Sequence, residues 1–454
     1  MELEKLFEET AAAKADARKR IDALIDGQSF VETDVLIRTE TPLGAAAGEG
    51  VVGGFASIDG LRVVVFATNP AVLKGSIGGK AADKIVRLTE NAVRCGAPVV
   101  ALFDTSGARF AEGTEAVSGY ARILGAFADA YGQVPVIVVN YGNNLGLLSY
   151  LAAYCDCCIG CEKSVSATAS PLVLAAKAGL GAEEVGTAKA LSAAGLYSFV
   201  VGSDAELKAG VSSVLSYLTE ADAAPSDDPN RTISGQGDMR AILAETFDAG
   251  TFHEMRAGSG KEAITGFARL DGTAVGVIAS DAAAGGGRIT ADGAVKITEL
   301  LNTCANAGLP VVHLVDCAGS AYDAKNDPAY IREIGNMIYT LHETDIPKVA
   351  VVTGQAIGLG YAAFADRSVC DYVAAWKSAR IGAMEDSAAA ELLYAKDIAA
   401  AKDKKKAEAA FAEKYSEENL SAAVSAAAGY VDNVIEPEFT RQYLISAVAA
   451  FAKR

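Results

Sequence analysis

The stretch Pro347–Ala363 (PKVAVVTGQAIGLGYAA) contains the pattern that decides the fold. Its apolar run Val349–Thr353 predicts a buried strand, and the glycines that follow, Gly354 and Gly358, predict a turn before a segment of small residues that can begin a helix. The first N–H groups of such a helix have no partner within it. They suit a negatively charged oxygen, although tight packing of helix against strand would select the same small residues.

The same pattern occurs earlier in the chain, at Pro135–Leu151 (PVIVVNYGNNLGLLSYL), and the offset in numbering is 347 − 135 = 212. The offset recurs elsewhere, because Asp59-Gly60 matches Asp271-Gly272 and Cys95–Val100 matches Ala307–Val312. A constant offset over roughly a hundred aligned positions is not expected by chance. The sequence therefore predicts an α/β protein built from two copies of one unit by internal duplication.

Length and charge narrow the class of protein. The 454 residues suffice for two or three domains, and the repeat selects two, at residues 1–220 and 235–454, with Leu218–Ser234 as a linker. The formal net charge of −17 argues against nucleic acid or an anionic membrane as a partner. Met1–Gly27 is charged throughout and predicts a helix rather than a signal peptide. A cytoplasmic location is expected.

The cysteines and histidines give little support for metal chemistry. Four of the eight cysteines gather at Cys155, Cys157, Cys158 and Cys161, with one Cys-x-x-Cys pair and no second pair at zinc spacing. Because the matching segment of the second copy predicts a strand, buried reduced thiols are favoured over a metal or redox role. No metal site is expected, and the chain contains neither a Walker motif nor a Gly-x-Ser-x-Gly elbow.

The periodicity of apolar residues predicts the remaining elements. Strands are expected at Val99–Phe103 and Val311–Val315, and hairpins around Asp59-Gly60 and Asp271-Gly272. Helices are expected at Glu2–Ile25, Lys80–Cys95, Gly119–Tyr131, Gly181–Leu191, Gly293–Ala305, Tyr330–Glu343 and Glu385–Tyr415.

The two glycine turns are equivalent candidate oxyanion sites, one near Gly146-Leu147 and the other near Leu359-Gly360. Each would stabilise charge that develops on a carbonyl oxygen. Two such sites without a nucleophile or a metal favour group transfer through enolate-like species, with the substrates supplying the acid–base chemistry. A purely structural role of the glycine turns is the alternative.

Four further motifs occur together along nearly the whole chain: Ala17–Asp22 (ARKRID), Gly75–Gly79 (GSIGG), Asp104–Arg109 (DTSGAR) with Glu112-Gly113, and Gly429–Pro437 (GYVDNVIEP). In combination they resemble the carboxyltransferase (β) subunits of biotin-dependent acyl-CoA carboxylases and the related subunits of decarboxylases. Each motif alone is weak, and the set is specific.

This resemblance implies two tandem crotonase-like domains, with acyl-CoA held mainly by the first and carboxybiotin by the second. It implies that the amides of Gly146 and Leu147 bind the thioester oxygen, and that those of Leu359 and Gly360 bind the ureido oxygen of biotin. The neighbouring backbone would line the substrate sites, at Gly107, Ala108, Gly319 and Gly358.

The resemblance also implies the partners. Biotin would arrive on a separate biotin carboxyl carrier protein, since Ala383-Met384 is followed by Glu385 and not by the lysine of a biotinylation motif. A coenzyme A thioester would be the substrate, a biotin carboxylase or a membrane subunit of a decarboxylase a further partner, and a homo-oligomer from dimer to hexamer the assembly. An inactive scaffolding paralogue and a biotin-independent crotonase-type enzyme are the alternatives. The family's glycine motifs are replaced by Leu145–Leu148 and Ile357–Tyr361, which leaves the acyl group and the reaction direction open.

Overall fold

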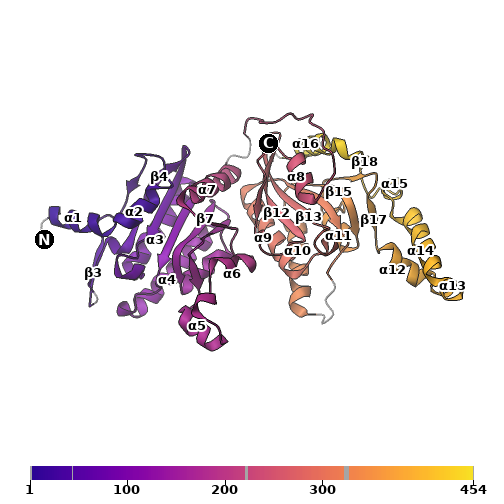
Figure 1. Cartoon of the computed structure of the whole chain (residues 1–454). Coiled ribbons are helices and arrows are strands. Elements are labelled where there is room, and N and C mark those ends of the chain that lie inside the picture. Colours follow the sequence, from indigo (N-terminus) through magenta and orange to yellow (C-terminus); the bar gives the residue numbers. More distant parts are fainter. Residues whose placement is uncertain (1–2, 43, 220–222, 322–326, 453–454) are drawn as a thin grey trace. The chain divides into compact units, whose positions relative to one another are not determined.

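A computed structural model describes residues 3–42, 44–219, 223–321 and 327–452. The chain divides into two compact units, Met1–Thr219 and Glu220–Arg454 (Figure 1). Each unit contains one eight-stranded mixed sheet among its described residues. The duplication expected from the repeat is therefore present in the fold.

The sheet of the first unit begins with an antiparallel hairpin and continues with parallel strands. Asp59 and Gly60, both at positive φ, form the hairpin turn, and the carboxylate of Asp26 accepts their amides at 3.0 and 2.9 Å. The strand order is β1 (Val31–Glu32), β4 (Val51–Ile58), β5 (Leu61–Thr68), β6 (Val99–Thr105), β7 (Val136–Leu145), β8 (Cys157–Cys161) and β10 (Phe199–Val201), with β9 (Val165–Ala167) paired to β7.

The sheet of the second unit repeats this topology and its register. Val65 pairs with Val100 in the first unit, and Val277 pairs with Val312 in the second, so both partners are displaced by the offset of the sequence repeat. The order is β11 (His253–Met255), β12 (Ala263–Leu270), β13 (Thr273–Ser280), β14 (Val311–Cys317), β15 (Lys348–Ile357), β16 (Tyr372–Trp376) and β18 (Asn433–Ile435), with β17 (Arg380–Gly382) paired to β15.

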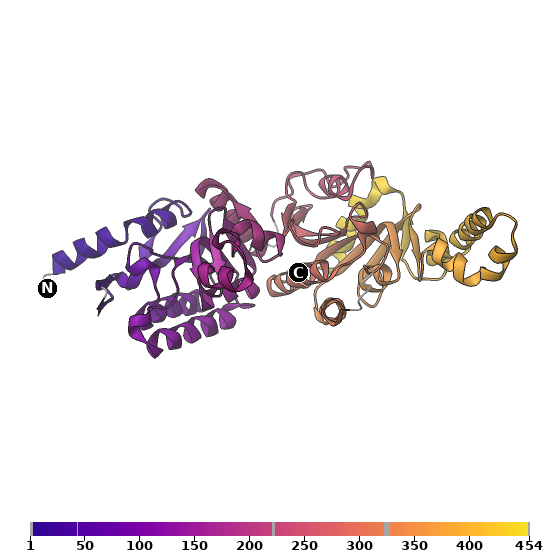
Figure 2. The ribbon, with the colours of Figure 1, turned by 60° about the horizontal axis from the view of Figure 1, so that its bottom comes forward.

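Pairs of long helices cover the parallel strands in both units. In the first unit α3 (Gly79–Cys95) and α4 (Thr114–Ala130) lie side by side (Figure 2) and bury apolar side chains against alternate residues of the sheet. Their counterparts in the second unit are α9 (Ala291–Ala307) and α10 (Pro328–Glu343). Further helices include α7 (Asp204–Thr219), α8 (Met239–Thr246), α15 (Ala422–Ala427) and α16 (Thr440–Phe451). A small hairpin is formed by β2 (Arg38–Thr41) and β3 (Gly44–Ala47).

Three expected helices differ in the structure. The amino-terminal helix is two helices, α1 (Leu3–Ala13) and α2 (Ala15–Asp22). The segment 171–193 contains α5 (Pro171–Ala178), a short 3₁₀ turn and α6 (Ala188–Ala193). The long helix expected at Glu385–Tyr415 is wrong, because the chain forms α12 (Asp386–Leu393), α13 (Ala395–Ala400) and α14 (Lys404–Tyr415).

The break before α14 has a local cause. Ala401 is extended, and the carboxylate of Asp403 accepts the amide of Lys406 at 3.1 Å, which makes Asp403 an N-cap. The charged run that suggested one solvated helix face thus contains a helix start. Residues 223–234, which the sequence places between the domains, lie against the second unit, where Ile233 is buried in the core.

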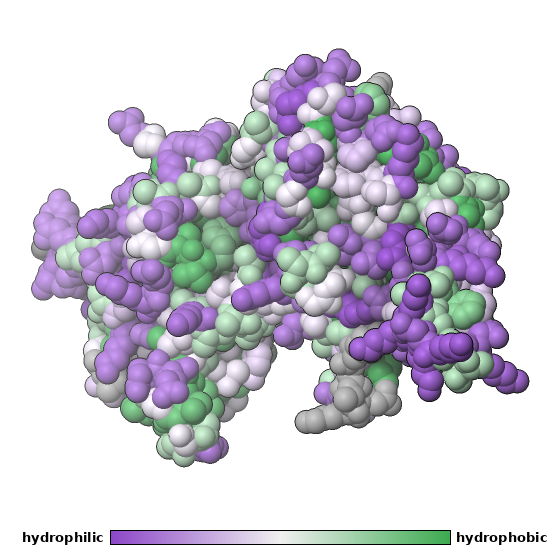
Figure 3. All heavy atoms as spheres, turned by 45° about the vertical axis from the view of Figure 1, so that its right-hand side comes forward, coloured by the Kyte–Doolittle hydropathy of each residue, from purple (hydrophilic) through white to green (hydrophobic). Residues whose placement is uncertain are grey.

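The cysteine-rich segment supplies β8 to the first sheet. Cys155, Cys157 and Cys158 are buried, and Cys161 is half-buried. Within the described residues no group of three or more His, Cys, Asp or Glu side chains could hold a metal ion. None of the described helices is long and apolar enough to cross a membrane. The face shown in Figure 3 carries many hydrophilic side chains, in keeping with the charge of the chain.

Candidate active site

The two glycine turns have the same construction in both units. β7 ends at Leu145, and Gly146 at φ +89° leads into a 3₁₀ helix, η4 (Leu147–Ala153). β15 runs through Gly354 to Ile357, and Gly358 at φ +53° leads into α11 (Leu359–Phe364). Residues other than glycine rarely adopt such φ values. The glycines therefore reverse the chain so that a helix begins directly at the end of the strand.

The amides at these turns fall into two groups. Gly146 and Gly358 donate their N–H groups back into the sheet, to the carbonyls of Ala167 and Gly382, each at 2.9 Å. Leu147 and Leu359 are the first residues of their helices, where an N–H has no acceptor within the helix. The amide of Gly146, which the resemblance assigned to the thioester oxygen, is thus already engaged, and Leu147 is the better donor.

Gly360 lies differently from Leu359. It is buried, and a Cβ at this position would lie 2.5 Å from the carbonyl oxygen of Cys317 on β14. The absence of a side chain at Gly360 therefore allows α11 to pack closely against β14. This is the packing role that the sequence left open as the alternative, and it is filled by one glycine of the turn.

A second pair of loops lies against the turns. Gly107 and Gly319, at φ +102° and +110°, accept hydrogen bonds from the amides of Ile77 and Ile289, each at 3.0 Å. A Cβ on Gly107 would lie 3.1 Å from the carbonyl of Leu145, and one on Gly319 would lie 3.3 Å from the carbonyl of Ile357. The loops that carry these glycines therefore pass directly beside the strand ends that lead into the turns.

The amide of Ala108 belongs to this arrangement. Gly107 and Arg109 bond Ile77 on one side, through the Gly107 carbonyl and the Arg109 amide at 3.0 and 2.9 Å. Successive amides of an extended chain point to opposite sides, so the N–H of Ala108 points away from Ile77. The predicted residues Gly107, Ala108 and Leu147 are thus brought to one end of the first sheet.

A carboxylate supports each turn from the neighbouring strand. Asp104 accepts the amide of Asn143 at 3.0 Å, and Asp316 accepts the amide of Gln355 at 2.8 Å. Asp104 also pairs with Arg20 of α2 at 2.9 Å. No ion pair of Asp316 occurs among the described residues, and burial raises the pKa of its carboxyl group. Both turns are therefore supported by an aspartate that accepts a backbone amide. Only the aspartate of the first turn, Asp104, also has an arginine as its ion-pair partner among the described residues.

A buried charge network holds the first loop. The guanidinium of Arg109 contacts Glu49 at 2.8 Å, Glu112 at 2.7 Å and the carbonyl of Ser76 at 3.0 Å. Glu112 in turn accepts the amide of Gly79 at the start of α3, at 2.7 Å. Arg109 and Glu49 are essentially inaccessible to solvent. The resemblance named Arg109 only as part of a motif, and the structure shows it as the residue that joins three segments.

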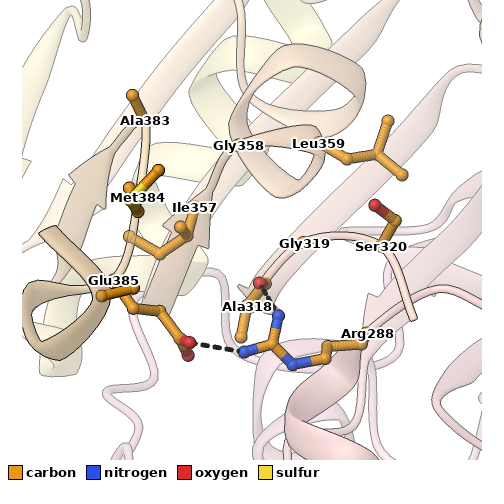
Figure 4. Close-up of a pocket in the computed structure, with 11 residues that line it drawn as sticks. Arg288, Ala318, Gly319, Ser320, Ile357, Gly358, Leu359, Ala383, Met384 and Glu385 are labelled. Atoms are coloured by element: carbon orange, nitrogen blue, oxygen red, sulfur yellow. Dashed lines mark hydrogen bonds and ion pairs between the residues drawn. The ribbon is translucent and has the colours of Figure 1, made fainter. Parts of the chain in front are cut away.

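The second unit has a hollow of about 180 Å³ at its turn (Figure 4). Three predicted site residues line it, Gly319, Gly358 and Leu359, whereas Gly360 does not. Two charged residues that the sequence did not single out also line it: Arg288 and Glu385 form an ion pair at 2.6 Å. One sequence feature could have pointed to Arg288. It follows the glycine run Gly285–Gly287 directly, at a position where the first copy has Ser76.

The first unit has a different hollow, which residues of η4 help to line. It encloses about 320 Å³ and is lined mainly by apolar surface together with Ser149, Tyr150 and Ser166. None of the predicted site residues lines it. Of these two hollows, only the one in the second unit is lined by predicted site residues. In the first unit the candidate site rests on the backbone geometry of the turn alone.

Comparison with known proteins identifies the family. The family described as carboxyl transferase domain matches residues 8–454. Methylmalonyl-CoA decarboxylase subunit alpha of Veillonella parvula is 32% identical, over 98% of this chain and 91% of its own. The biotin-dependent acetyl-/propionyl-coenzyme A carboxylase beta5 subunit of Mycobacterium tuberculosis is 30% identical, over 98% and 88%.

A solved structure extends the likeness to three dimensions. The crystal structure of transcarboxylase 12S, a hexamer with methylmalonyl-coenzyme A and methylmalonic acid bound, matches with a TM-score of 0.91 at 30% identity, over 98% of this chain and 92% of that chain. The fold is accordingly a pair of tandem crotonase-like domains, as expected. The chain belongs to the carboxyl transferase domain family, and it is a carboxyltransferase of the kind found in biotin-dependent acyl-CoA carboxylases and decarboxylases.

Proposed function

We propose that this protein moves a carboxyl group between biotin, carried on a separate protein, and a small acyl-CoA, and that its two glycine turns bind the two reacting carbonyl groups. The observation that carries the proposal is the duplicated strand–glycine–helix turn with a helix-start amide at Leu147 and at Leu359. Two preorganised donors of this kind can hold two carbonyl oxygens on which negative charge develops.

The first turn is assigned to the acyl-CoA. The amide of Leu147 would donate to the thioester oxygen, with Ala108 as a second donor from the neighbouring loop. Charge on this oxygen grows as the α-carbon becomes an enolate, so the donors stabilise the transition state more than the ground state. Asp104 and Arg109 keep the two loops in place through their bonds to Asn143, Ser76 and Glu49.

The second turn is assigned to biotin. A ureido oxygen fits a hollow of about 180 Å³ that Leu359 helps to line. No cluster of metal ligands occurs among the described residues. Biotin, when bound, would carry the carboxyl group on a ureido nitrogen, and that nitrogen would take the acyl α-proton as the carboxyl group moves to the α-carbon. The protein's own contribution would be the Leu359 amide and the close packing of Gly360 on β14.

The assembly and location follow the same proposal. We place the protein in the cytoplasm as a homo-oligomer that works with a biotin carboxyl carrier protein and with either a biotin carboxylase or a decarboxylase membrane subunit. The resemblance to a hexameric transcarboxylase 12S supports the oligomer. Domain 1–220 would face the acyl-CoA and domain 235–454 the carboxybiotin.

The deciding experiment is decarboxylation of malonyl-CoA or methylmalonyl-CoA by the purified chain, with and without free biotin. Loss of the carboxyl group only when biotin is present is the expected result. Turnover without biotin would instead indicate a crotonase-type enzyme. Absence of turnover with both substrates, in a protein that still binds acyl-CoA, would indicate a scaffolding paralogue.

A further inference from the structure

The hollow at the second turn is bordered by a charge pair that the first unit lacks. Arg288 precedes α9 and Glu385 precedes α12, and their side chains face each other across one side of the hollow (Figure 4). Ser76 is the counterpart of Arg288 in the first unit. The counterpart of Glu385 is Ser170, because β9 and β17 are 215 residues apart, and Ser170 precedes α5 as Glu385 precedes α12. The duplicated fold is therefore complete without this pair.

The ion pair contributes little to the stability of the fold. The side chains of Arg288 and Glu385 remain 18% and 32% exposed, and pairs with this access to water contribute about 0–1 kcal/mol. Glu385 is also the N-cap residue of α12, yet its carboxylate caps no amide of that helix. Its carboxylate contacts Arg288 and not the helix that follows it.

Arg288 is held in place without Glu385. Its guanidinium also donates to the carbonyl of Ala318, on the loop that carries Gly319. This bond fixes the arginine beside the hollow when the carboxylate partner changes. Arginine presents a planar set of donors that matches a carboxylate, so the position now taken by Glu385 can be taken by the carboxylate of a ligand.

We propose that Arg288 is the carboxylate-binding residue of the second hollow, and that Glu385 is an internal carboxylate which occupies it until a ligand carboxylate displaces it. This inference rests on the proposed function, in which the ligand is an N-carboxylated urea whose ring carbonyl accepts the Leu359 amide. The volume of about 180 Å³ is smaller than that of usual ligand pockets, about 300–1,000 Å³. It admits the reacting end of a ligand and excludes the rest.

The consequence is competition between two carboxylates for one guanidinium. Removing the charge of Glu385 makes it easier for a ligand carboxylate to reach Arg288. Removing Arg288 takes away the cation that the ligand carboxylate would bind. A neutral ligand of the same shape is indifferent to both changes. A purely structural role of Arg288 would not produce this dependence on the charge of the ligand.

Malonate, with malonamide as its uncharged analogue, is the probe, and isothermal titration calorimetry at low ionic strength is the measurement. Glu385→Gln should bind malonate about tenfold more tightly than the parent, the effect of one charge-assisted hydrogen bond made available. Arg288→Gln should lose malonate binding, and Arg288→Lys should restore part of it. Malonamide should not distinguish the four proteins.

A matched control is offered by Arg380 and Asp386, an ion pair close by in the chain whose residues do not line the hollow. Asp386→Asn should leave malonate affinity unchanged. Equal affinity of the parent and Glu385→Gln, or full malonate binding by Arg288→Gln, would overturn the inference. Thermal melting within a few degrees of the parent verifies that each variant is folded.

The test does not depend on turnover, so it separates this inference from the proposed function. Charge-selective malonate binding without biotin-dependent decarboxylation would retain Arg288 as an anion site and reject the function. Biotin-dependent decarboxylation with the same kcat and KM in the parent and in Arg288→Gln would retain the function and reject the role of Arg288.

Discussion

Lys84 and Lys296 occupy the same place in the two units, separated by the offset of the sequence repeat. Each is buried and donates from Nζ to the carbonyl at the start of a hairpin strand, Lys84 to Val51 at 2.6 Å and Lys296 to Ala263 at 2.7 Å. Burial lowers the pKa of both amines from 10.5 to about 8. Each unit thus contains an amine whose proton is easily lost.

The first prediction concerns stability against pH. Between pH 8 and 10.5 the unfolded chain binds protons at these two lysines and the folded chain does not. The free energy of unfolding should therefore rise with pH across this window through their contribution. Lys84→Met/Lys296→Met should flatten the rise, whereas Lys80→Met at an exposed position should leave it. Urea unfolding measures the slope, and identical slopes in all three proteins would contradict the prediction.

The second prediction concerns the donor at Leu359. Leu359→Pro removes the N–H at the first position of α11, where proline is compatible with a helix. The melting temperature should stay close to that of the parent, while biotin-dependent turnover falls on the order of 10²–10³-fold. Leu359→Ala keeps the amide and should lose far less. A folded proline variant with full turnover would remove the second oxyanion hole, and Leu147→Pro applies the same test to the first.

The third prediction concerns the backbone of the first turn. Gly146 has φ +89° and ψ −147° with open space around its Cα, so Gly146→Ala meets strain and no clash. The variant should lose about 1–3 kcal/mol of unfolding free energy, and turnover should fall as the turn shifts. Gly125→Ala within α4 also has open space and should gain about 0.5–1 kcal/mol. Chemical denaturation should show the opposite signs, and equal effects would contradict the role of φ.

The fourth prediction concerns the buried pair of Arg109 and Glu49. Arg109→Met leaves the carboxylate of Glu49 buried without its cation and should cost about 3–5 kcal/mol of unfolding free energy. Adding Glu49→Gln removes the charge and should recover much of that loss. The double-mutant cycle is the measurement, and strictly additive effects of the two substitutions would show that the pair is not coupled.

The sequence predicted the repeated units correctly, but it did not predict contacts between residues that are distant in the chain. Two strand–turn–helix units with equal spacing followed from local patterns at Gly146 and Gly358. The engagement of the Gly146 amide by Ala167 could not follow from them, because it depends on the pairing of β9 with β7. The contact of Arg288 with Glu385 likewise joins the starts of two helices distant in sequence.

The sequence also failed to predict where helices begin and end in the alanine-rich segment 385–415. Helical propensity is high throughout residues 385–415, so nothing in it distinguishes one helix from three. The capping bond of Asp403 sets the start of α14 through a single side chain. The strand that continues past Gly354 is a similar case, since the support of Asp316 for the amide of Gln355 keeps the chain extended.

The ion pair of Arg20 with Asp104 marks a further difference between the two units. Arg20 also stacks on Tyr141 of β7, 4.3 Å from the ring centroid, so α2 braces the strand that leads to Gly146. Asp316 has no matching brace among the described residues. Proteolytic removal of the first helices is therefore expected to loosen the turn at Gly146 and to leave the turn at Gly358 unchanged, so the two copies of one fold differ in their sensitivity to loss of the amino-terminal segment.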